Sequence, residues 1–468
     1  MPARWLEELR RAVGPNNVLV DRSDTESFSH DETTSDRFRR YPEAVVKPAT
    51  EEQVAQVIRL CSEHGVPVTA RGGGTGLTGA CVAAAGGIVL SLEHLNRIIE
   101  IDGRNHSITA QAGVQLSSLF AEIRKANLFF PPHPGDESAY VGGVIATNAG
   151  GARAVKYGTV RRFLTGLRVV TASGDTLDLG GKLLKSSMGY NLLGLLIGSE
   201  GTLGIITRAT FALLPNPGCL QTLVVPFDTI DQATAAVAQL LDRGITPCAV
   251  EFIEHAAVRC SERLLKKSWP ARVGSASLMF ILDGPSDEEV TSAAQAVSEV
   301  MEENGALDVL LAEHEARQAE ILEIRSMIYE ALRPGAIELF DVSLPRSEIP
   351  GHVARVHELE REHGIPLPTY GHAADGNVHT QSMRVSIEDG VLGEEIEGWQ
   401  EKQAGAREGI YADAIARGGV VSGEHGVGLV KKDFLARNLG VGAVEMMKAI
   451  KRSLDPKGIL NPGKIFDL

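Results

Sequence analysis

At 468 residues the chain is too long for a single core of ordinary size, so two or three domains are expected. Hydrophobic residues at 43% and charged residues at 23% are typical of a globular protein and exclude a disordered or coiled-coil chain. The net charge of -14, with dispersed basic residues, argues against a nucleic-acid or anionic-membrane surface and favours small-molecule or protein partners.

The cysteines and the N-terminus indicate where the protein works. The five cysteines form no CxxC pair, so neither a disulfide framework nor an iron-sulfur cluster is expected, and a reducing cytoplasm fits. The first residues, MPARWLEELRRAVG, are typical of a short amphipathic helix without the apolar core of a signal peptide. No run of about twenty apolar residues follows, so we expect a cytoplasmic protein without a membrane span.

The segment from Ala44 to Ala80 predicts a strand, a helix, a second strand and a glycine loop. Thr50 with Gln53 forms a capping box at the helix start, and Gly65 provides a left-handed stop. The helix has one apolar face, made of Val54, Val57, Ile58 and Cys61. The β-branched run VPVT then predicts a buried strand that leads into the loop.

Five of the eight residues from Gly72 to Gly79 are glycine, and Gly74, Gly76 and Gly79 match the GxGxxG pattern of a Rossmann nucleotide site. A Rossmann loop opens a helix, whereas here only about two turns fit before Gly86-Gly87 and a strand. We therefore expect an anion nest, in which backbone N–H groups converge on a phosphate. The alternative is a structural turn, which needs only one or two glycines.

A second glycine cluster lies in residues 131–160, and GSEGTLGIIT follows at residues 198–207. Glycines next to Ala, Thr and Asn let backbone lie flat against a planar ligand; a tightly packed loop core is the alternative. Together the three segments resemble the FAD-binding domain of the vanillyl-alcohol oxidase and p-cresol methylhydroxylase superfamily over residues 40–215. The resemblance implies bound FAD near Arg71, Gly72, Gly73, Gly74, Thr75, Gly76, Leu77, Thr78, Pro134, Gly135, Gly142, Gly143, Ala146, Thr147, Asn148, Gly150, Gly151, Gly201 and Ile206.

The same resemblance bears on how FAD is attached. Members that bind FAD covalently usually have a histidine in the first loop, whereas this chain has Thr75 there, so non-covalent FAD is expected. Beyond about residue 215 the chain alternates strand-like and helix-like segments, which predicts an α+β cap with a mostly antiparallel sheet.

The stretch TYGHAADGNVHT, Thr369 to Thr380, brackets an Asp-Gly turn with two histidines. A two-residue turn at Asp375-Gly376 would place His372 opposite His379, close enough for both imidazoles to bind one cation. Further along, Glu424 and His425 lie in a glycine frame and offer the third ligand. The alternative is an exposed polar loop with a solvated histidine. His357 and His363 lie on a charged helix and are predicted bystanders.

Two imidazoles and a carboxylate suit zinc, iron or manganese with open positions for substrate. With a flavin nearby, a 2-hydroxy acid chelating the metal would direct its α-C–H towards flavin N5, and His425 would take the hydroxyl proton. Arg325 is a candidate for the substrate carboxylate, although a solvated helix arginine is an equal alternative.

The second half, with RSMIYEA, DVSLP, GHAADGNVH, GEHGVG and NPGKIF, resembles the flavin-dependent D-2-hydroxy acid dehydrogenases. This resemblance implies metal ligands His372, His379 and Glu424, base His425, substrate contacts Arg325 and Asn377, and flavin contacts Asn461 and Lys464. Relatives acting on 2-hydroxyglutarate tend to have lysine in a KYDVSLP-like run where this chain has Leu339-Phe340-Asp341. Without a lysine at this position a second substrate carboxylate has no cationic partner, which favours D-lactate or glycolate as substrate.

These observations combine into an α+β protein with a two-subdomain FAD-binding domain of the p-cresol methylhydroxylase type and an α+β cap. The expected divisions are an N-terminal helical segment (1–38), the FAD domain (39–215), the cap with the metal site (216–420) and a C-terminal segment that returns to the FAD domain (421–468).

Reduced FAD requires an external electron acceptor: an electron-transfer flavoprotein, quinone-linked subunits or a cytochrome. A homodimer or a subunit of a hetero-complex fits. The alternatives are a non-redox flavoenzyme like alkylglycerone-phosphate synthase, a non-catalytic electron-relay subunit, and a metallohydrolase, which would leave the glycine clusters unexplained.

Overall fold

The computed structural model describes residues 4–33, 36–312 and 314–468, and the chain divides into two compact units. The first unit combines residues 1–150, 159–216 and 424–468, and the second combines residues 151–158 and 217–423. The first three residues of the predicted N-terminal helix lie outside the described part, and the helix itself runs from Arg4 to Val13 (α1). Each unit has its own sheets, and together they give the α+β class that the sequence predicts.

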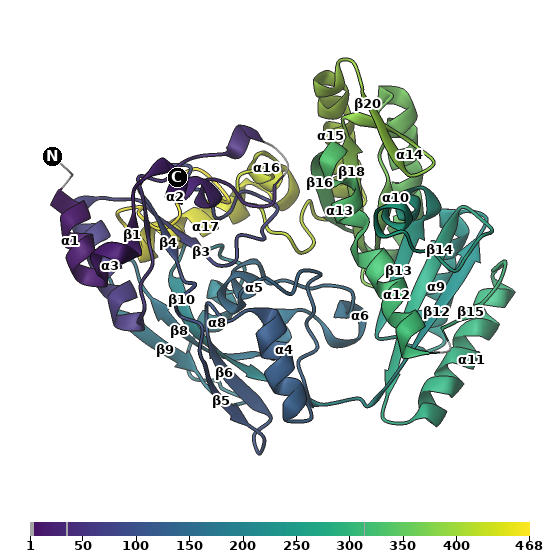
Figure 1. Cartoon of the computed structure of the whole chain (residues 1–468), viewed down its shortest axis with the longest axis horizontal. Helices are drawn as coiled ribbons and strands as arrows, with labels where there is room; N and C mark the ends of the chain where they lie inside the picture. Colours follow the sequence, from purple (N-terminus) through teal and green to yellow (C-terminus); the bar gives the residue numbers. More distant parts are fainter. Residues whose placement is uncertain (1–3, 34–35, 313) are drawn as a thin grey trace. The chain divides into compact units, whose positions relative to one another are not determined.

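The first unit contains two main sheets and a small one (Figure 1). Their strand orders are β1-β2-β4-β3, β5-β6-β10-β8-β9 and β11-β7. The strands are β1 (Val18–Leu19), β2 (Ala44–Val46), β3 (Val68–Arg71), β4 (Ile88–Ser91), β5 (Ile98–Asp102), β6 (Ser107–Gln111), β7 (Leu128–Phe129), β8 (Leu164–Val170), β9 (Thr176–Gly180), β10 (Ile205–Ala212) and β11 (Leu214–Pro215). The helices besides α1 are α2 (Arg22–Thr25), α3 (Glu51–His64), α4 (Leu116–Lys125), α5 (Val141–Thr147), α7 (Val160–Phe163), α8 (Leu192–Leu196), α16 (Lys432–Leu439) and α17 (Val441–Leu454).

Helix α3 forms as its sequence predicts. The hydroxyl of Thr50 accepts a hydrogen bond from the Gln53 N–H, the Gln53 side chain accepts from the Ala49 N–H, and Gly65 ends the helix with φ +67°. Strand β3 follows and ends at Arg71, where the glycine loop begins. The described residues between β3 and β4 form turns without a helix, which excludes a Rossmann arrangement at this loop.

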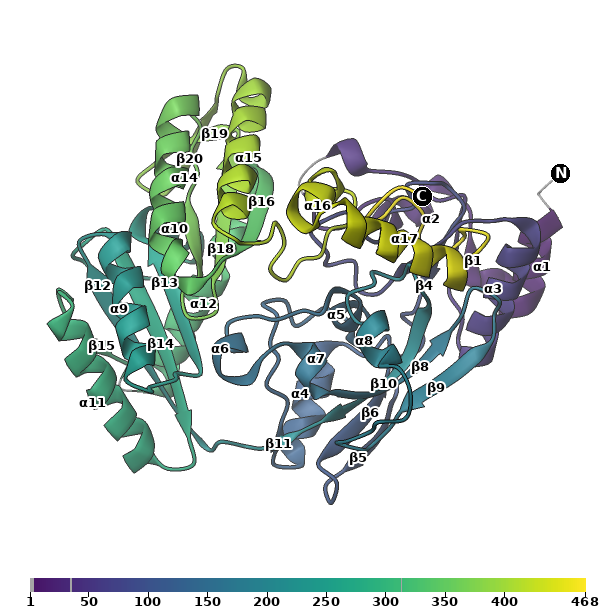
Figure 2. The ribbon, with the colours of Figure 1, turned by 180° about the vertical axis from the view of Figure 1, so that it is seen from behind.

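The C-terminal segment returns to the first unit, as expected. After α17, Leu460 pairs with Val68 beside β3, and the Asn461 N–H donates to the Val68 carbonyl (Figure 2, yellow). The chain end therefore extends the sheet whose β3 strand leads into the glycine loop.

The second unit is built on one seven-stranded antiparallel sheet, in the order β15-β12-β14-β13-β17-β18-β16 (Figure 1). Its strands are β12 (Cys219–Phe227), β13 (Ala249–Glu254), β14 (Ala276–Gly284), β15 (Leu310–Leu311), β16 (Ala336–Ser343), β17 (Thr369–His372) and β18 (Asn377–Met383), with a separate hairpin of β19 (Val385–Glu388) and β20 (Val391–Glu395). Its helices are α6 (Ala154–Tyr157), α9 (Ile230–Asp242), α10 (His255–Leu265), α11 (Asp287–Glu303), α12 (Glu315–Ser326), α13 (Ile328–Leu332), α14 (Ile349–His363) and α15 (Trp399–Ala416).

Helices cover both faces of this sheet. Helices α9 and α11 pack on β12, β13 and β14, and α15 packs on β16, where Tyr411 meets Phe340 edge to face. The apolar sides of α10, α12 and α13 form a buried cluster with Ile253 and Tyr370 on the opposite face. Because strand side chains alternate between faces, Glu251, Tyr370, His372 and His379 share this second face.

No helix in the described ranges is both long enough and apolar enough to span a bilayer.

Residues 151–158 belong to the second unit, although their flanking residues belong to the first. The Lys156 ammonium donates to the Asp283 carbonyl and, at 2.5 Å, to Oδ1 of the same residue, while the Tyr157 hydroxyl donates to Oδ2. The Asp283 side chain is fully buried. This carboxylate therefore anchors α6 to β14.

Replacing Asp283 with Ala should release the α6 segment, since Lys156 and Tyr157 lose the buried carboxylate that they share as acceptor. We expect trypsin to cleave after Arg153 or Lys156 at least roughly five times faster than in the wild type, as opening of such a segment becomes about 1–3 kcal/mol easier. Limited proteolysis with mass spectrometry measures this. Asp242→Ala, at an exposed position on α9, is the control, and equal cleavage in the two variants would contradict the anchor.

Candidate active site

The glycine loop forms one wall of a pocket in the first unit. Most residues assigned to FAD by the sequence line it: Arg71, Gly72, Gly73, Gly74, Thr75, Gly76, Leu77, Pro134, Gly135, Gly142, Gly143, Ala146, Thr147, Gly201 and Ile206. Side chains that the sequence did not indicate also line it, among them Cys81, Leu92, Tyr140 and Glu200. Glu424 and His425 are part of the same lining.

Two glycines show why side chains are excluded here. Gly74 has φ +81°, and a Cβ on it would lie 2.1 Å from an Arg71 guanidinium nitrogen. A Cβ on Gly142 would lie 2.9 Å from the Cβ of Ala112, whereas one on Gly143 would meet no atom within 4 Å, in space that belongs to the pocket. The pocket therefore has room where a side chain would stand, and its glycine walls fit a large planar ligand with a phosphate group, as FAD has.

The glycine loop is braced from behind by residues 27–33. Guanidinium nitrogens of Arg71 donate to the carbonyls of Ser27 and His30, at 2.9 and 2.6 Å. The buried carboxylate of Asp31 accepts hydrogen bonds from the N–H groups of Gly79, at 2.7 Å, and Thr33. Burial raises the pKa of Asp31 to about 6 against the lowering effect of these hydrogen bonds.

The remaining residues assigned to FAD do not belong to the described pocket lining: Thr78, Asn148, Gly150, Gly151, Asn461 and Lys464. Several of them support the lining. The Asn461 amide donates to the carbonyls of Ala80 and Glu200, and Lys464 donates to the Val82 carbonyl. Burial lowers the pKa of Lys464 to about 8. The predicted contact of these residues with the flavin stays a prediction, and Asn461 and Lys464 bind backbone carbonyls of residues just after the glycine loop.

The segment with Glu424 and His425 is fixed in the first unit by Glu200. The Glu200 carboxylate accepts hydrogen bonds from the N–H groups of Val427, at 2.7 Å, and Gly428, at 2.9 Å. Burial raises the pKa of Glu200, and the two backbone hydrogen bonds oppose that shift. Glu200 itself has φ +50°, an uncommon conformation for a residue with a side chain. The result is a loop that holds its two polar side chains at the edge of the pocket.

In the second unit the predicted hairpin forms with a different register. His372 pairs with Asn377, and His379 pairs with Tyr370, so the predicted pairing of His372 with His379 is wrong. The turn contains four residues, 373–376, because the Ala373 N–H continues the pairing with Val250 and Gly376, at φ +95°, packs against Leu344.

The two imidazoles nevertheless lie on one face as diagonal neighbours. Their ring centroids are 5.2 Å apart and nearly perpendicular, and both side chains are buried. Glu251 on β13 holds the first of them, with its Oε1 2.5 Å from Nδ1 of His372. A histidine held in this way presents Nε2 to a cation.

Arg325, the predicted substrate contact, lies on α12 with its Nε donating to Oε2 of Glu251 at 2.7 Å. Its guanidinium also lies over the ring of Tyr370, 5.0 Å from the centroid. Burial alone would raise the pKa of Glu251, but Arg325 and His372 together lower it to about 2. The Glu251 carboxyl is therefore ionised. The predicted contact between Arg325 and substrate stays a prediction.

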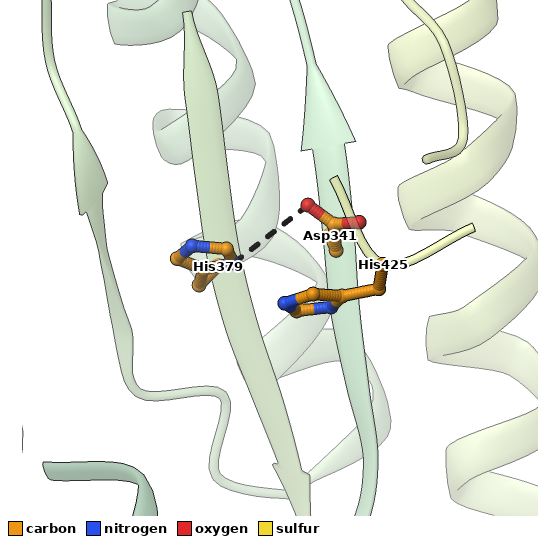
Figure 3. A group of neighbouring side chains, drawn as sticks. All are labelled: Asp341, His379 and His425. Atoms are coloured by element: carbon orange, nitrogen blue, oxygen red, sulfur yellow. Dashed lines mark ion pairs between the residues drawn. The ribbon is translucent and has the colours of Figure 1, made fainter. Parts of the chain in front are cut away.

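Asp341 connects the histidine strand to the start of the GEHG segment. Figure 3 shows Asp341 and His379 on neighbouring strands, with 3.9 Å between an Asp341 oxygen and Nδ1 of His379. Asn377 donates its amide to Asp341 Oδ1 at 2.8 Å, and the Gly423 N–H donates to Oδ2 at 3.1 Å. Within the described ranges, the buried amide oxygen of Asn377 has no hydrogen-bond partner. A buried, unsatisfied oxygen beside two histidines is what a site for a cation or a polar substrate would contain.

Sequence reasoning missed Glu251, Asp31 and Glu200. Only Glu251 carried a detectable signal: it interrupts the apolar strand AVEFIE, and a charged residue at such a position is rarely buried without partners. His363 packs on Gly405, whereas His357 pairs with Glu254 on the other face of the sheet from His372.

Comparison with known proteins gives a consistent set of similarities. A family model described as FAD binding domain matches residues 42–180, and one described as FAD linked oxidases, C-terminal domain, matches residues 218–465. The chain is 41% identical to the D-lactate dehydrogenase of Archaeoglobus fulgidus over 98% of this chain and 99% of that protein. It is 36% identical to the glycolate oxidase subunit GlcD of Bacillus subtilis, over 98% and 96% respectively. The solved structure of p-cresol methylhydroxylase with substrate bound shares the fold, with a TM-score of 0.77 at 20% identity, covering 99% of this chain and 96% of that one.

Asp31 predicts a pH dependence of stability. Its pKa in the folded protein, about 6, is above its ordinary value of 3.8, so the folded state binds the proton more tightly. Protonated Asp31 therefore stabilises the folded state by about 3 kcal/mol relative to the ionised form. This stabilisation is present at pH 4 and is lost as the pH rises to about 6. Thermal unfolding of wild type and Asp31→Asn from pH 4 to 7 should show the wild type gaining on the variant as the pH falls.

Asp21→Asn, at an exposed position of the same N-terminal region, is the matched control and should give a difference that does not change with pH. A pH-independent difference for Asp31→Asn as well would show that folding does not raise the pKa of Asp31.

Proposed function

The chain belongs to the family of FAD-linked oxidases and is an FAD-dependent hydroxy acid dehydrogenase, and we propose that it oxidises D-lactate or glycolate with the help of a divalent metal ion. One observation carries the metal-dependent part of this proposal: the position of the dipeptide Glu424-His425 in the chain. Both residues line the pocket of the first unit. Glu424 also follows Gly423 directly, so its Cα is one peptide unit, about 3.8 Å, from the Cα of a residue held by Asp341.

The residues that would hold the metal are His372, His379 and Glu424. The two histidines are buried on one sheet face, and because Nδ1 of His372 binds Glu251, Nε2 is the nitrogen that would bind a cation. Asp341 already accepts hydrogen bonds from Asn377, Ser422 and Gly423, which makes Glu424 the better carboxylate ligand. A divalent cation, when bound, would polarise the substrate hydroxyl and lower its pKa.

FAD, when bound, supplies a two-electron acceptor for a hydride at N5. The glycine-walled pocket would hold FAD in this chain. Thr75 occupies the loop position where members that bind FAD covalently usually have a histidine, so the cofactor is held without a covalent bond. The residues that brace the walls, such as Asn461 and Lys464, keep the backbone N–H groups of the loop in place.

In the proposed reaction the chain moves one proton and orients the substrate. His425 would accept the proton of the substrate hydroxyl, and bound FAD would supply the acceptor for the hydride that the α-carbon loses as the 2-oxo acid forms. Arg325 would bind the substrate carboxylate, and the unsatisfied amide oxygen of Asn377 would contact a polar substrate group. Two electrons then leave to an external acceptor, an electron-transfer flavoprotein, a quinone-linked subunit or a cytochrome.

The side chain of Leu339 bears on the size of the substrate. Leu339 pairs with Gln381 on the sheet face that bears His379 and Asp341. An apolar side chain here offers no partner for a second carboxylate, which favours a short acid over 2-hydroxyglutarate.

An anaerobic visible spectrum tests the proposal as a whole. D-lactate should bleach the flavin absorbance of the purified holoenzyme. After chelation the bleaching should slow by at least roughly 100-fold, because several kcal/mol of hydroxyl activation is lost, and one of Zn²⁺, Mn²⁺ or Fe²⁺ should restore it. Full-rate bleaching of protein shown to be metal-free by elemental analysis would refute the metal requirement.

His425→Asn is the variant for the proton acceptor. It should retain the oxidised flavin spectrum and metal content but be bleached about 10²–10⁴ times more slowly. His94→Asn, at an exposed position of the first unit, is the control. An unchanged bleaching rate in His425→Asn would show that His425 is not the proton acceptor and would favour an electron-relay role for the chain.

Substrate choice is measured by kcat/KM. We expect D-lactate to exceed D-2-hydroxyglutarate by at least about tenfold, because burying an unpaired carboxylate costs more than 1.4 kcal/mol. Leu339→Lys should narrow the ratio by about 10- to 100-fold by supplying a cation, whereas Leu339→Met should not change it. A wild-type ratio in favour of D-2-hydroxyglutarate would overturn the assignment to a short acid.

A further inference from the structure

Glu251 is a carboxylate inside a buried strand. It lies in the middle of β13, is 1% exposed, and pairs with Met279 on one neighbouring strand and with His372 on the other. Its strand neighbours Val250 and Phe252 are buried apolar residues on the opposite face of the sheet. A charge in such a position is costly unless donors surround it.

The two carboxylate oxygens of Glu251 have different partners. Oε1 lies 2.5 Å from Nδ1 of His372, and Oε2 accepts from Nε of Arg325 at 2.7 Å and also from its Nη2. One side chain thus joins a strand residue of the sheet to a residue of α12.

The contact between Glu251 and His372 determines which imidazole nitrogen of His372 would bind a cation. Oε1 of Glu251 lies 2.5 Å from Nδ1 of His372 and acts as the acceptor of this hydrogen bond, so Nδ1 carries the hydrogen and the lone pair is on Nε2. Without this acceptor the ring could rotate or take the other tautomer, and Nδ1 and Nε2 would compete for a cation. A negative partner also makes the imidazole a stronger donor to a metal.

The contact with Arg325 fixes the guanidinium from a second side. Tyr370 lies beneath it, 5.0 Å from the guanidinium carbon to the ring centroid, and the ring of Tyr370 lies 5.7 Å from that of His379. Arg325, Tyr370 and both histidines therefore form one packed group, in which Glu251 is a carboxylate partner shared by Arg325 and His372.

We propose that Glu251 is the positioning residue of this site, which orients His372 for metal binding and Arg325 for the substrate carboxylate through one shared carboxylate. The inference rests on the proposed function, because it assumes that His372 binds a cation. It adds a residue whose own side chain need not touch metal or substrate. It also makes the metal ligand and the substrate-binding arginine sensitive to the same substitution.

A purely structural ion pair makes a different prediction. Removing it would lower the unfolding temperature and leave the metal affinity of the folded protein unchanged. A positioning residue must instead change the affinity and geometry of the metal site in protein that remains folded.

The experiment compares Glu251→Gln with Glu254→Gln. Glu254 is the matched control because it lies on the same strand, holds His357 and the Thr369 N–H, and faces away from the site. Both proteins are purified with FAD, stripped of metal and titrated with Zn²⁺ against a chromophoric chelator, and circular dichroism and flavin content report folding. We expect Glu251→Gln to bind Zn²⁺ about 10- to 100-fold more weakly than wild type and Glu254→Gln to bind it as wild type does.

Two further readouts keep the test decisive. Co²⁺-substituted Glu251→Gln should show a d–d spectrum different from that of wild type, and with D-lactate its KM should rise. Glu251→Asp keeps the charge that balances Arg325 but shortens the side chain, so it should fold as wild type while still losing Zn²⁺ affinity. If Glu251→Gln does not fold, Glu251→Asp alone decides the question.

Histidine labelled with ¹⁵N separates this inference from the proposed function. In metal-free wild type His372 should carry its hydrogen on Nδ1, a signal assigned by its loss in His372→Asn, and this state should change in Glu251→Gln. A wild type that binds no Zn²⁺ would refute the proposed metal site and, with it, the role of Glu251 in metal binding. Wild-type metal binding with unchanged affinity and unchanged tautomer in folded Glu251→Gln and Glu251→Asp would refute the inference alone.

Discussion

Buried carboxylates that accept hydrogen bonds from backbone N–H groups and cationic side chains hold every segment of the candidate site. Asp31 holds the glycine loop through the Gly79 N–H, Glu200 holds Val427 and Gly428, and Asp341 holds Gly423. Glu251 does the same for side chains instead of backbone. A buried carboxylate is tolerated only where donors satisfy it, so each of these contacts fixes the loop that supplies the donors. Loops without regular secondary structure thereby become as well defined as the strands beside them.

This constraint explains why Glu424 and His425 can act as a unit. The peptide that precedes them is held by Asp341 within the second unit, and the residues that follow are held by Glu200 within the first. Between the two anchors the chain contributes only Glu424, His425 and Gly426, which leaves little freedom for the two side chains. Gly426 has φ +84°, and a Cβ there would lie 2.9 Å from Glu200 Oε1, so the short segment requires glycine at this turn. Asp283 provides a similar anchor for residues 151–158, which are also attached to the first unit at both ends.

The success of sequence reasoning depended on how local each feature is. The side-chain cap of Thr50 and the stop at Gly65 involve neighbouring residues, so the helix and the strand that follows were predictable, as was the absence of a Rossmann helix after Gly79. The hairpin register was not predictable from the sequence. Asp375-Gly376 suggested a two-residue turn, but the contacts that set the register, Ala373 with Val250 and Gly376 with Leu344, come from distant segments. Both histidines still lie on one face because a register shift of two residues preserves the alternation of side chains.

The same distinction explains which site residues escaped detection. Histidines in glycine frames are visible in a sequence because their chemistry is unusual, whereas Glu200 and Asp31 resemble ordinary surface carboxylates until the fold supplies their donors. Glu251 was the exception, since a glutamate within AVEFIE contradicts the apolar pattern of its strand. A local conflict of this kind, kept at a buried position, costs free energy that hydrophobic packing would not. Its retention beside His372 is best explained by a requirement for an oriented imidazole, because a Leu or Met at this position would pack on the sheet but leave both His372 and Arg325 without their acceptor.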